Sequence, residues 1–317
     1  MSQGELMYVS GRYVAAAEAT VSASDAGLLL GAGLFETLRI YGGRTFRLAA
    51  HLARLRASGQ VMRIFVRETD DEIAAIIARL LEANGLGDAR VRLTATRGPL
   101  DPHLEDDAAP RATLIVAAGP MTHYPKEFYD QGASVIVSDI KANETDPTSV
   151  HKTTSYARNL LALREAHRVH AAEALLFNTR NRLAEGTLSN VFIVKGGRLA
   201  TPPVEDGALP GIARAVVLEA AAEAGIPAEQ RSLVIRDLLD ADEVFLTNSV
   251  MEVMPVVRIE GHEVGPKDDP ARQPSGHGTP AVPGGAAAAS PDRLGRPGPV
   301  TRRLAEAYRD MVARETA

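Results

Sequence analysis

Two residues whose side chains can do covalent or acid–base chemistry stand where predicted elements end. Lys152 lies in the loop HKTTSY, directly before a predicted helix. Glu185 lies between two predicted strands, in the stretch LAEGTLSN that ends at Asn190. Taken alone, a loop lysine or a turn glutamate is usually a solvated surface charge. Each therefore indicates a site only if other predicted element ends supply complementary groups.

Such groups are present, and together they could hold a phosphate. The segment LPGIAR opens a predicted helix at Gly211, where free N–H groups and the helix dipole attract an anion. Ser249, at the strand end TNS, offers a hydroxyl, and Arg54, one helical turn after His51, could add a charge-assisted clamp. A phosphate beside a Schiff-base lysine, with a carboxylate for a protonated ring nitrogen, predicts pyridoxal phosphate as the cofactor.

Composition excludes several other classes of function. The 317 residues include no cysteine, which excludes disulfides, thiolate metal sites and a cysteine nucleophile. A net charge of −5 offers no basic field to nucleic acid or an anionic membrane. No apolar run approaches the roughly 20 residues of a spanning helix, and the N-terminus lacks a signal-peptide pattern. We therefore expect a cytoplasmic protein that binds neither nucleic acid nor membrane.

One alternative set of chemical residues stays open. His167, His170 and Glu173 are spaced three apart, as metal ligands on one helix face would be in a metal-dependent hydrolase. However, they fall where a predicted helix gives way to a strand, which favours a solvated helix end and no metal. The sequence also lacks GxGxxG after a strand, GxxxxGK[ST], HExxH and GxSxG.

The helices and strands expected around these residues indicate an α+β fold. Residues 1–118 are expected to form a small domain. It should contain a hairpin at Ser10-Gly11, a second turn at Gly42-Gly43, and a helix capped by Thr69 and Glu72. Residues 119–130, with two prolines, are the expected connection between domains. The strands expected in the small domain, besides those of the first hairpin, are 34–41, 44–48, 89–97 and 112–118; its helices begin near 50 and 69.

Residues 131–317 are expected to form the larger, cofactor-binding domain. Its expected strands are 134–139, 174–178, 190–195, 198–200, 243–247 and 253–259; its expected helices are 156–169, 211–224 and 300–313. Strands outnumber helices without regular βαβ alternation, which predicts a mixed, barrel-like sheet with helices around it. Prolines and glycines crowd residues 266–299, so we expect a flexible surface insertion there, since few apolar side chains offset the entropy of ordering it.

Six motifs then follow in one order: GAGLFETLRIY, HLARLRAS, KTTSY, EGTLSN, LPGIAR and TNSVMEVMPV. In this order they resemble the fold type IV, or class IV, pyridoxal-phosphate aminotransferases. That family contains branched-chain aminotransferases, D-amino-acid aminotransferases and aminodeoxychorismate lyase. The resemblance runs from Tyr8 to about Arg258 and resumes at residues 298–301. It implies the fold type IV architecture and a homodimer with its sites near the interface.

The resemblance implies a role for each matching residue. Lys152 is implied to form the internal aldimine and to shuttle the proton between Cα and C4′ of the cofactor. Glu185 is implied to pair with the pyridine nitrogen and keep it protonated. Tyr156 would border the phenolic oxygen, and Asn190 would order the loop after Glu185. The remaining implied cofactor contacts are Arg54, Gly211, Ile212, Ala213, Asn248 and Ser249.

For the substrate, the resemblance implies contacts from Phe35 and Val250, and Arg39 and Arg97 are candidates for binding its carboxylate. Many relatives carry an acidic residue where Ala32 stands, and Thr96-Arg97-Gly98 lacks the following arginine of D-amino-acid enzymes. We therefore expect ping-pong transamination of branched-chain or other apolar L-amino acids with a 2-keto acid. Aminodeoxychorismate lyase is the alternative, and a D-amino-acid aminotransferase is less favoured.

Overall fold

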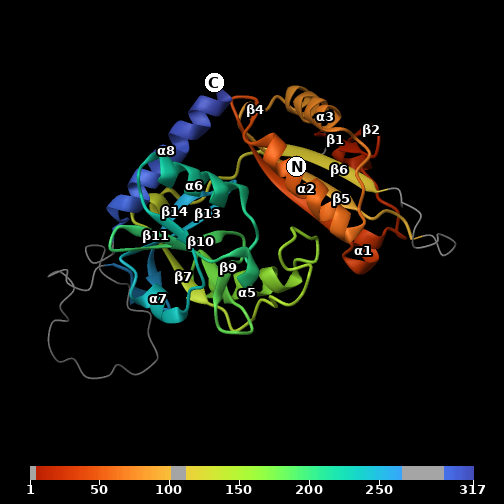
Figure 1. The fold of residues 1–317 in the computed structure, drawn as a ribbon. Coiled ribbons are helices and arrows are strands. Elements are labelled where there is room, and N and C mark those ends of the chain that lie inside the picture. Colours follow the sequence, from red (N-terminus) through yellow and green to blue (C-terminus); the bar gives the residue numbers. More distant parts are fainter. Residues whose placement is uncertain (1–4, 101–111, 266–295) are drawn as a thin grey trace, which may run out of the picture.

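Two β-sheets, each with its own helices, lie side by side in the computed structural model (Figure 1). The structure describes residues 5–100, 112–265 and 296–317. The first sheet is antiparallel throughout, in the order β2-β1-β6-β5-β3-β4. The second is mixed, in the order β12-β11-β10-β13-β14-β7-β8-β9, with β15 paired to β14. The content is therefore mixed α and β, as the sequence predicts.

The first sheet and its helices lie in the described residues up to Pro120. Its strands are β1 (Leu6–Val9), β2 (Arg12–Ala15), β3 (Gly33–Tyr41), β4 (Arg44–Thr45), β5 (Ala89–Thr96) and β6 (Thr113–Pro120). Its helices are η1 (Ala16–Glu18), α1 (Ala26–Leu30), α2 (Leu48–Met62) and α3 (Asp70–Ala83). The predicted capping box closes the start of α3, where Thr69 and Glu72 bond each other's backbone.

The second sheet and its helices lie in the described residues after Pro120. Its strands are β7 (Ala133–Val137), β8 (Glu173–Phe177), β9 (Leu183–Gly186), β10 (Asn190–Lys195), β11 (Arg198–Thr201), β12 (Ala228–Gln230), β13 (Glu243–Asn248), β14 (Glu252–Ile259) and β15 (His262–Glu263). Its helices are α4 (Lys126–Asp130), α5 (Ala157–Arg168), η2 (Val204–Asp206), α6 (Ile212–Glu223), α7 (Ile235–Leu239) and α8 (Pro299–Thr316). No described helix is long and apolar enough to cross a membrane.

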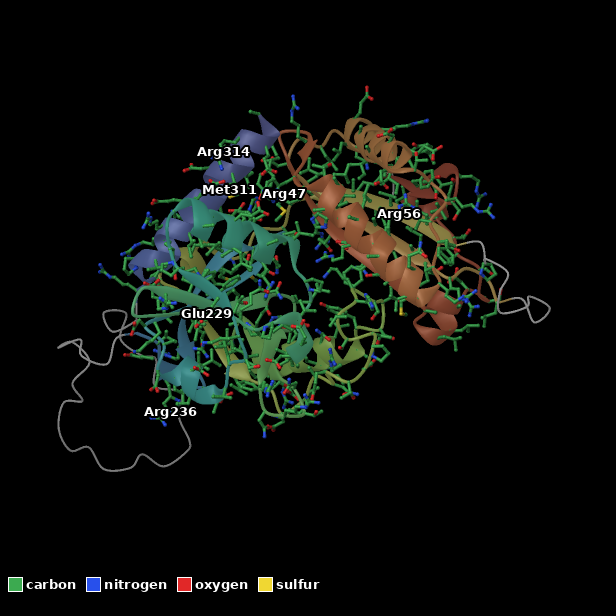
Figure 2. The ribbon with its side chains drawn as sticks, in the orientation of Figure 1. Arg47, Arg56, Glu229, Arg236, Met311 and Arg314 are labelled. Atoms are coloured by element: carbon green, nitrogen blue, oxygen red, sulfur yellow. The ribbon has the colours of Figure 1, made fainter. Side chains whose placement is uncertain are left out.

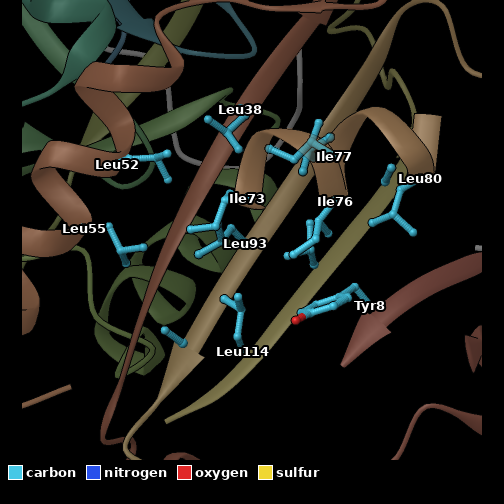
Figure 3. Close-up of a cluster of buried hydrophobic side chains, with 14 of the residues drawn as sticks. Tyr8, Leu38, Leu52, Leu55, Ile73, Ile76, Ile77, Leu80, Leu93 and Leu114 are labelled. Carbon is cyan, nitrogen blue, oxygen red and sulfur yellow. The ribbon is translucent and has the colours of Figure 1, made fainter. Parts of the chain in front are cut away.

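Period-two alternation gives the first sheet one apolar and one polar face. Leu38 of β3 and Leu93 of β5 point to the core, where Leu52 of α2 and Ile73 of α3 cover them (Figure 3). The side chains at the intervening positions of β3 and β5 point to the opposite face, away from α2 and α3. That second face is the one that meets the rest of the molecule.

The second sheet is apolar on both faces, which explains its continuous hydrophobic strands. Along β10, Val191 and Ile193 enter one core cluster, whereas Phe192 enters another with α6 and α8. The ring of Phe192 stacks on Phe245 of β13 at 5.0 Å between centroids. Burying both faces leaves only the ends of this sheet available for polar chemistry.

Polar contacts join the two parts of the chain at their edges. Arg47, which precedes α2, lies where α2, α6 and α8 converge (Figure 2) and donates to Glu219 at 2.7 Å and to Glu315 at 2.6 Å. The Tyr41 hydroxyl donates to Glu252 at 2.8 Å. These contacts hold the polar face of the first sheet against the second sheet.

The observed elements differ from the predicted ones at several places. Glu185 lies in strand β9 rather than in a turn, because residues 183–186 pair with β8. The strand predicted over 44–48 ends at Thr45 because α2 begins at Leu48, and α8 begins at Pro299, inside the predicted insertion. The helices α1, α4 and α7 were not predicted, since five residues carry too little periodicity. Residues 266–295 of the insertion lie outside the described residues.

Candidate active site

A cavity of about 610 Å³ is lined by residues from both parts of the chain. It brings together most of the predicted site residues, although they come from several separate elements. Those that line it are Phe35, Arg54, Lys152, Tyr156, Glu185, Asn190, Gly211, Ile212, Ala213, Asn248, Ser249 and Val250.

The loop that carries Lys152 is held by the start of β3. The N–H of Phe35 donates to the carbonyl of Lys152 at 2.9 Å, and the N–H of Thr154 donates to the carbonyl of Gly33 at 2.8 Å. A Cβ at Gly33 would stand 2.7 Å from Thr154 Oγ1, closer than side chains tolerate, and Gly31 meets the same loop. The glycines of GAGLFETLRIY are therefore needed so that the lysine loop can approach.

The environment of Lys152 favours its neutral amine. Burial, reinforced by the nearby charge of Arg54, lowers the pKa of Lys152 to about 8, although Glu185 opposes the shift. Its Nζ lies 4.5 Å from the centroid of the Phe35 ring and 5.9 Å from that of Tyr156. A buried lysine of this kind can act as a nucleophile near neutral pH.

Glu185 and Asn190 together fix the segment that leads into α6. Glu185 Oε2 accepts a hydrogen bond from the N–H of Leu209 at 2.9 Å, and Asn190 Nδ2 donates to the Leu209 carbonyl at 2.8 Å. Burial raises the pKa of Glu185 to about 7. A protonated ring nitrogen beside this carboxyl would favour its ionised form.

The N-terminus of α6 opens into the cavity without a side-chain cap. Gly211 precedes the helix in extended conformation, and a Cβ on it would collide with Asn190 Oδ1. Ile212 and Ala213, the first helical residues, also line the cavity. The first N–H groups of a helix have no partner within the helix, so this turn can bind a phosphate.

Arg54 reaches this helix start in a fixed orientation. Its Nε and Nη2 donate to the two oxygens of Glu36 at 2.8 and 2.6 Å, and its Nη1 donates to the carbonyl of Pro210 at 2.9 Å. His51 Nδ1 lies 2.7 Å from Glu36 Oε2. Although burial alone would raise the pKa of Glu36, Arg54 and His51 hold it at about 2. The ionised carboxylate therefore orients the guanidinium.

Two more polar residues shape this end of the cavity. Thr247 is buried, and its Oγ1 has no hydrogen-bond partner among the described residues. Asn248 Oδ1 accepts from the N–H groups of Val250 and Met251, both at 2.8 Å, and so orders the turn that carries Ser249. The orphaned hydroxyl, the uncapped helix and Arg54 fit a phosphate, and Lys152 and Glu185 fit an aldehyde and a ring nitrogen. The residues present therefore fit pyridoxal phosphate.

The family model for amino-transferase class IV matches residues 33–259. The chain belongs to the class IV aminotransferases. This match confirms the resemblance seen in the six motifs.

Named relatives of this class IV aminotransferase differ in their activities. A putative branched-chain-amino-acid aminotransferase of Methanocaldococcus jannaschii is 35% identical, over 82% of this chain and 90% of its own length. A D-alanine aminotransferase of Listeria innocua is 30% identical, over 81% and 88%. An aminodeoxychorismate lyase of Bacillus subtilis is 31% identical, over 80% and 87%.

Solved structures of branched-chain aminotransferases share the fold. That of Escherichia coli has a TM-score of 0.84 at 28% identity, covering 99% of this chain and 96% of its own. That of the thermophilic archaeon Thermoproteus uzoniensis, solved with norvaline, has a TM-score of 0.80 at 28% identity, covering 97% and 94%. The predicted fold type IV architecture is thereby confirmed.

In this class IV aminotransferase, Tyr156 is bonded to the chain rather than left free. It precedes α5, and its hydroxyl donates to the Thr187 carbonyl at 3.3 Å. Its ring meets that of Phe35 edge to face at 5.4 Å between centroids. Burial raises the pKa of the Tyr156 phenol, with Glu185 adding to the shift. The hydroxyl therefore stays protonated as a donor.

Two predicted substrate contacts do not line the cavity. Arg39 is buried with its guanidinium 4.7 Å from the centroid of the Tyr41 ring, at the edge where the two sheets meet. Arg97 is half-buried at the end of β5, and its N–H donates to the carbonyl of Ala32. Neither arginine lines this cavity, and their assignment as carboxylate contacts stays a prediction.

Sequence reasoning missed three other arginines that line the cavity, Arg90 and Arg92 of β5 and Arg158 of α5. The two arginines of β5 alternate with the buried residues Val91 and Leu93. This period-two pattern was a readable signal for a polar sheet face. It also missed Glu36, whose role depends on contacts that form only in the folded chain.

The alternative metal site is not assembled. Glu173 is buried in β8, where one oxygen accepts from Thr187 Oγ1, Ser189 Oγ and the N–H of Leu188. His167 lies in the last turn of α5, beyond which the chain turns at a left-handed residue, His170. No group of three or more histidine, aspartate or glutamate side chains within the described ranges could hold a metal ion.

Proposed function

We propose that this chain is a pyridoxal-phosphate-dependent aminotransferase that exchanges the amino group of an α-amino acid with a 2-keto acid. The observation that carries the proposal is that Lys152, Glu185 and the uncapped start of α6 line one cavity. The class IV family supports the same cofactor and reaction type. The predicted cofactor contacts of Arg54, Tyr156, Asn190 and Ser249 are part of this proposal.

Each group has a distinct task in the proposed reaction. Bound pyridoxal phosphate supplies an aldehyde and an electron-withdrawing ring that stabilises negative charge on substrate Cα. The amine of Lys152 would hold the cofactor's aldehyde end and would move the proton at substrate Cα. Glu185 holds a proton on the ring nitrogen, while Arg54 and the first N–H groups of α6 hold the phosphate. Two half-reactions in ping-pong order follow.

The proposed substrates are branched-chain or other apolar L-amino acids. Phe35 and Val250 give the cavity apolar surface beside the reactive amine, and the Methanocaldococcus relative supports the same class. The Bacillus relative favours a second candidate, pyruvate elimination from aminodeoxychorismate. We favour transamination, because the fold extends over 99% of this chain in a branched-chain aminotransferase.

The visible spectrum of the purified protein tests the cofactor. We expect a yellow protein, or one that becomes yellow with added pyridoxal phosphate, and borohydride should attach the label to Lys152 as seen by peptide mass. Leucine with 2-oxoglutarate should then yield glutamate. A colourless protein that takes up no cofactor contradicts the proposal, and pyruvate release from aminodeoxychorismate without a keto acid would favour the lyase.

We also propose a homodimer. Leu28, Leu29 and Leu30 of α1 are 68%, 55% and 67% exposed, and Leu160 and Leu161 of α5 are each 55% exposed. Exposed apolar side chains in such number mark an interaction surface, and a second copy is the partner that the family suggests. Sedimentation velocity should give twice the 33.7 kDa chain mass; a monomer at micromolar concentration would contradict it.

A further inference from the structure

One buried carboxyl group has no part in the proposed reaction. Glu173 opens strand β8 with 1% of its surface exposed, and it is not among the residues that line the cavity. Its Oε1 has no hydrogen-bond partner in the described part of the chain. Burial raises the pKa of this carboxyl, although its hydrogen bonds oppose the shift. Because a buried carboxyl is costly to keep, its presence here indicates a specific task.

The other oxygen of Glu173 holds the turn between β9 and β10. This Oε2 accepts hydrogen bonds from Thr187 Oγ1 at 3.1 Å, from the N–H of Leu188 at 3.0 Å and from Ser189 Oγ at 2.9 Å. A Cβ added at Gly186 would stand 2.6 Å from the same oxygen, so the glycine leaves room for it. Donors from three consecutive residues thus converge on one oxygen and fix the conformation of the turn.

The same turn presents its carbonyl groups to residues of the cavity. The Thr187 carbonyl accepts from the Tyr156 hydroxyl at 3.3 Å and from Asn159 Nδ2 at 2.9 Å. The Leu188 carbonyl accepts from Asn248 Nδ2 at 3.1 Å. All three donor side chains line the cavity. The turn therefore connects the buried carboxyl to cavity side chains at the start of α5 and at the end of β13.

Among these side chains, Tyr156 is the one whose displacement is easiest to measure. Its hydroxyl is the predicted neighbour of the phenolic oxygen of the cofactor, and its bond to Thr187 is long enough for the proton to turn to a closer acceptor. In the loaded protein, the nitrogen that joins Lys152 to the cofactor shares its proton with that phenolic oxygen. A donor to the oxygen therefore lowers the pKa of the nitrogen, and a misplaced donor raises it.

We propose that Glu173 is a positioning residue of the cofactor site: its carboxyl holds the turn of residues 187–189, and the turn places the Tyr156 hydroxyl for the phenolic oxygen. This inference rests on the proposed aminotransferase function and adds to it a residue that lies behind the cavity. Glu173 acts through Thr187 and does not touch the cofactor. The residue considered as a metal ligand in the sequence thereby receives a different task.

The pH dependence of the visible spectrum of the loaded protein tests the proposal, because its midpoint reports the pKa of the nitrogen joined to Lys152. Tyr156→Phe removes the donor itself and should raise the midpoint by about one pH unit, the scale of one hydrogen bond to a charged oxygen. Glu173→Ala should raise it by roughly half a unit or more. Glu173→Gln keeps an oxygen for the turn, so its midpoint should stay close to that of wild type.

The direction of the shift separates positioning from charge. Loss of a nearby negative charge by itself would lower the pKa of a protonated nitrogen, whereas loss of the donor raises it. An unchanged or lowered midpoint in Glu173→Ala would therefore overturn the inference. An unchanged midpoint in Tyr156→Phe would overturn it too, since the proposed route runs through that hydroxyl.

Glu243→Ala is the matched control for lost stability. Glu243 is also buried, and it accepts from the N–H groups of Val300 and Thr301 and from Thr301 Oγ1 at the start of α8, away from the cavity lining. This variant should lose stability and keep the wild-type midpoint. A rise equal to that of Glu173→Ala would contradict a specific role for Glu173.

A second variant decides if Glu173→Ala fails to fold, as judged by circular dichroism. Thr187→Val removes one donor to Glu173 and keeps the Thr187 carbonyl, so it should raise the midpoint by a smaller amount, and an unchanged midpoint would then overturn the inference. A wild-type protein that takes up cofactor while its variants keep the wild-type midpoint refutes this inference alone. A wild-type protein that takes up no cofactor refutes the proposed function, and the inference with it.

Discussion

The two walls of the cavity are built in opposite ways. On the wall formed by the second sheet, polar groups are bonded to one another: Glu185 and Asn190 hold the backbone of Leu209 from both sides, and Tyr156 donates to Thr187. On the wall formed by β3 and β5, Arg90 and Arg92 carry charge with no acidic partner in the described part of the chain. Apart from Arg158 Nε, the Thr247 hydroxyl and the start of α6, the polar groups of the first wall are bonded within the chain, whereas the two arginines of the second wall are not neutralised.

The difference follows from what each wall has to bind. A cofactor is always the same molecule, so its contacts can be fixed by hydrogen bonds that form on folding and cost no reorganisation later. A substrate enters and leaves in every cycle, so its binding groups must be unpaired when the cavity is empty. Arg54 belongs to the first kind even though it lies on α2, because Glu36 already orients it.

Removal of the amine should have the largest effect. Lys152→Ala deletes both the group that binds the aldehyde and the group that moves the proton, so we expect turnover to fall by about 10⁴-fold or more. Steady-state glutamate formation measures it, and borohydride should no longer label the chain. Lys126→Ala, on exposed α4, is the control, and residual turnover above one per cent would contradict the role of Lys152.

Loss of the buried carboxylate should rank next. Glu185→Gln keeps an oxygen for the N–H of Leu209 but removes the negative charge that would hold the ring-nitrogen proton. We expect kcat to fall about 10²-fold, the scale of one preorganised electrostatic contact, with little change in folding. Glu229→Gln, exposed on β12 (Figure 2), is the matched control. An unchanged kcat would show that the charge of Glu185 does not affect the ring nitrogen of the cofactor.

The buried pair of Glu36 and Arg54 should also contribute to folding stability. Glu36→Gln leaves the buried Arg54 without its ionised partner, and we expect unfolding free energy to fall by about 3 kcal/mol, as when one member of a buried pair is removed. Urea denaturation measures it. Glu219→Gln, which loses an exposed pair with Arg47, should cost about 1 kcal/mol or less, and equal losses would contradict the comparison.

A change on the second wall should alter substrate binding and leave the cofactor alone. Phe35→Leu removes the ring on which Arg92 and Lys152 pack, and a lost cation–π contact corresponds to roughly 3- to 10-fold in KM. Initial-rate kinetics give the KM, and absorbance titration gives the cofactor Kd, which should stay constant. Phe128→Leu, on α4, controls for lost packing. A larger change in the cofactor Kd than in the substrate KM would contradict the assignment of this wall to substrate binding.

The last expected effect is on the pH dependence of stability. The pKa of Lys152 is about 8 when folded and 10.5 in its ordinary range, so the unfolded chain binds more protons between those values and stability rises with pH there. In the cofactor-free protein, Lys152→Met should therefore be more stable than wild type at pH 7, by on the order of 3 kcal/mol. This advantage should shrink between pH 8 and 10.5. Urea unfolding at several pH values measures it, and parallel pH curves would contradict the shifted pKa.

Local patterns predicted the elements well where a signal is confined to a few residues. The capping box at Thr69 and Glu72, the turn at Gly42-Gly43 and the strand over residues 190–195 all appear where the sequence places them. Strand β9 was missed, because residues 183–186 become a strand only by pairing with β8. Five-residue helices were missed for lack of a repeated apolar face.

For the site, the sequence was enough to predict the cofactor chemistry, because it places a lysine, a glutamate and phosphate-binding groups at the ends of predicted elements. The six motifs, in their order, predicted the family. Which charges are free depends instead on tertiary contacts. The sequence does not distinguish one arginine from another: Arg39, Arg54, Arg90 and Arg97. In the fold, Glu36 neutralises Arg54, Arg39 is buried at the sheet edge, and Arg90 of β5 lines the cavity. A charge acts through its distance to other charges, and in this protein those distances are set between strands that are remote in sequence.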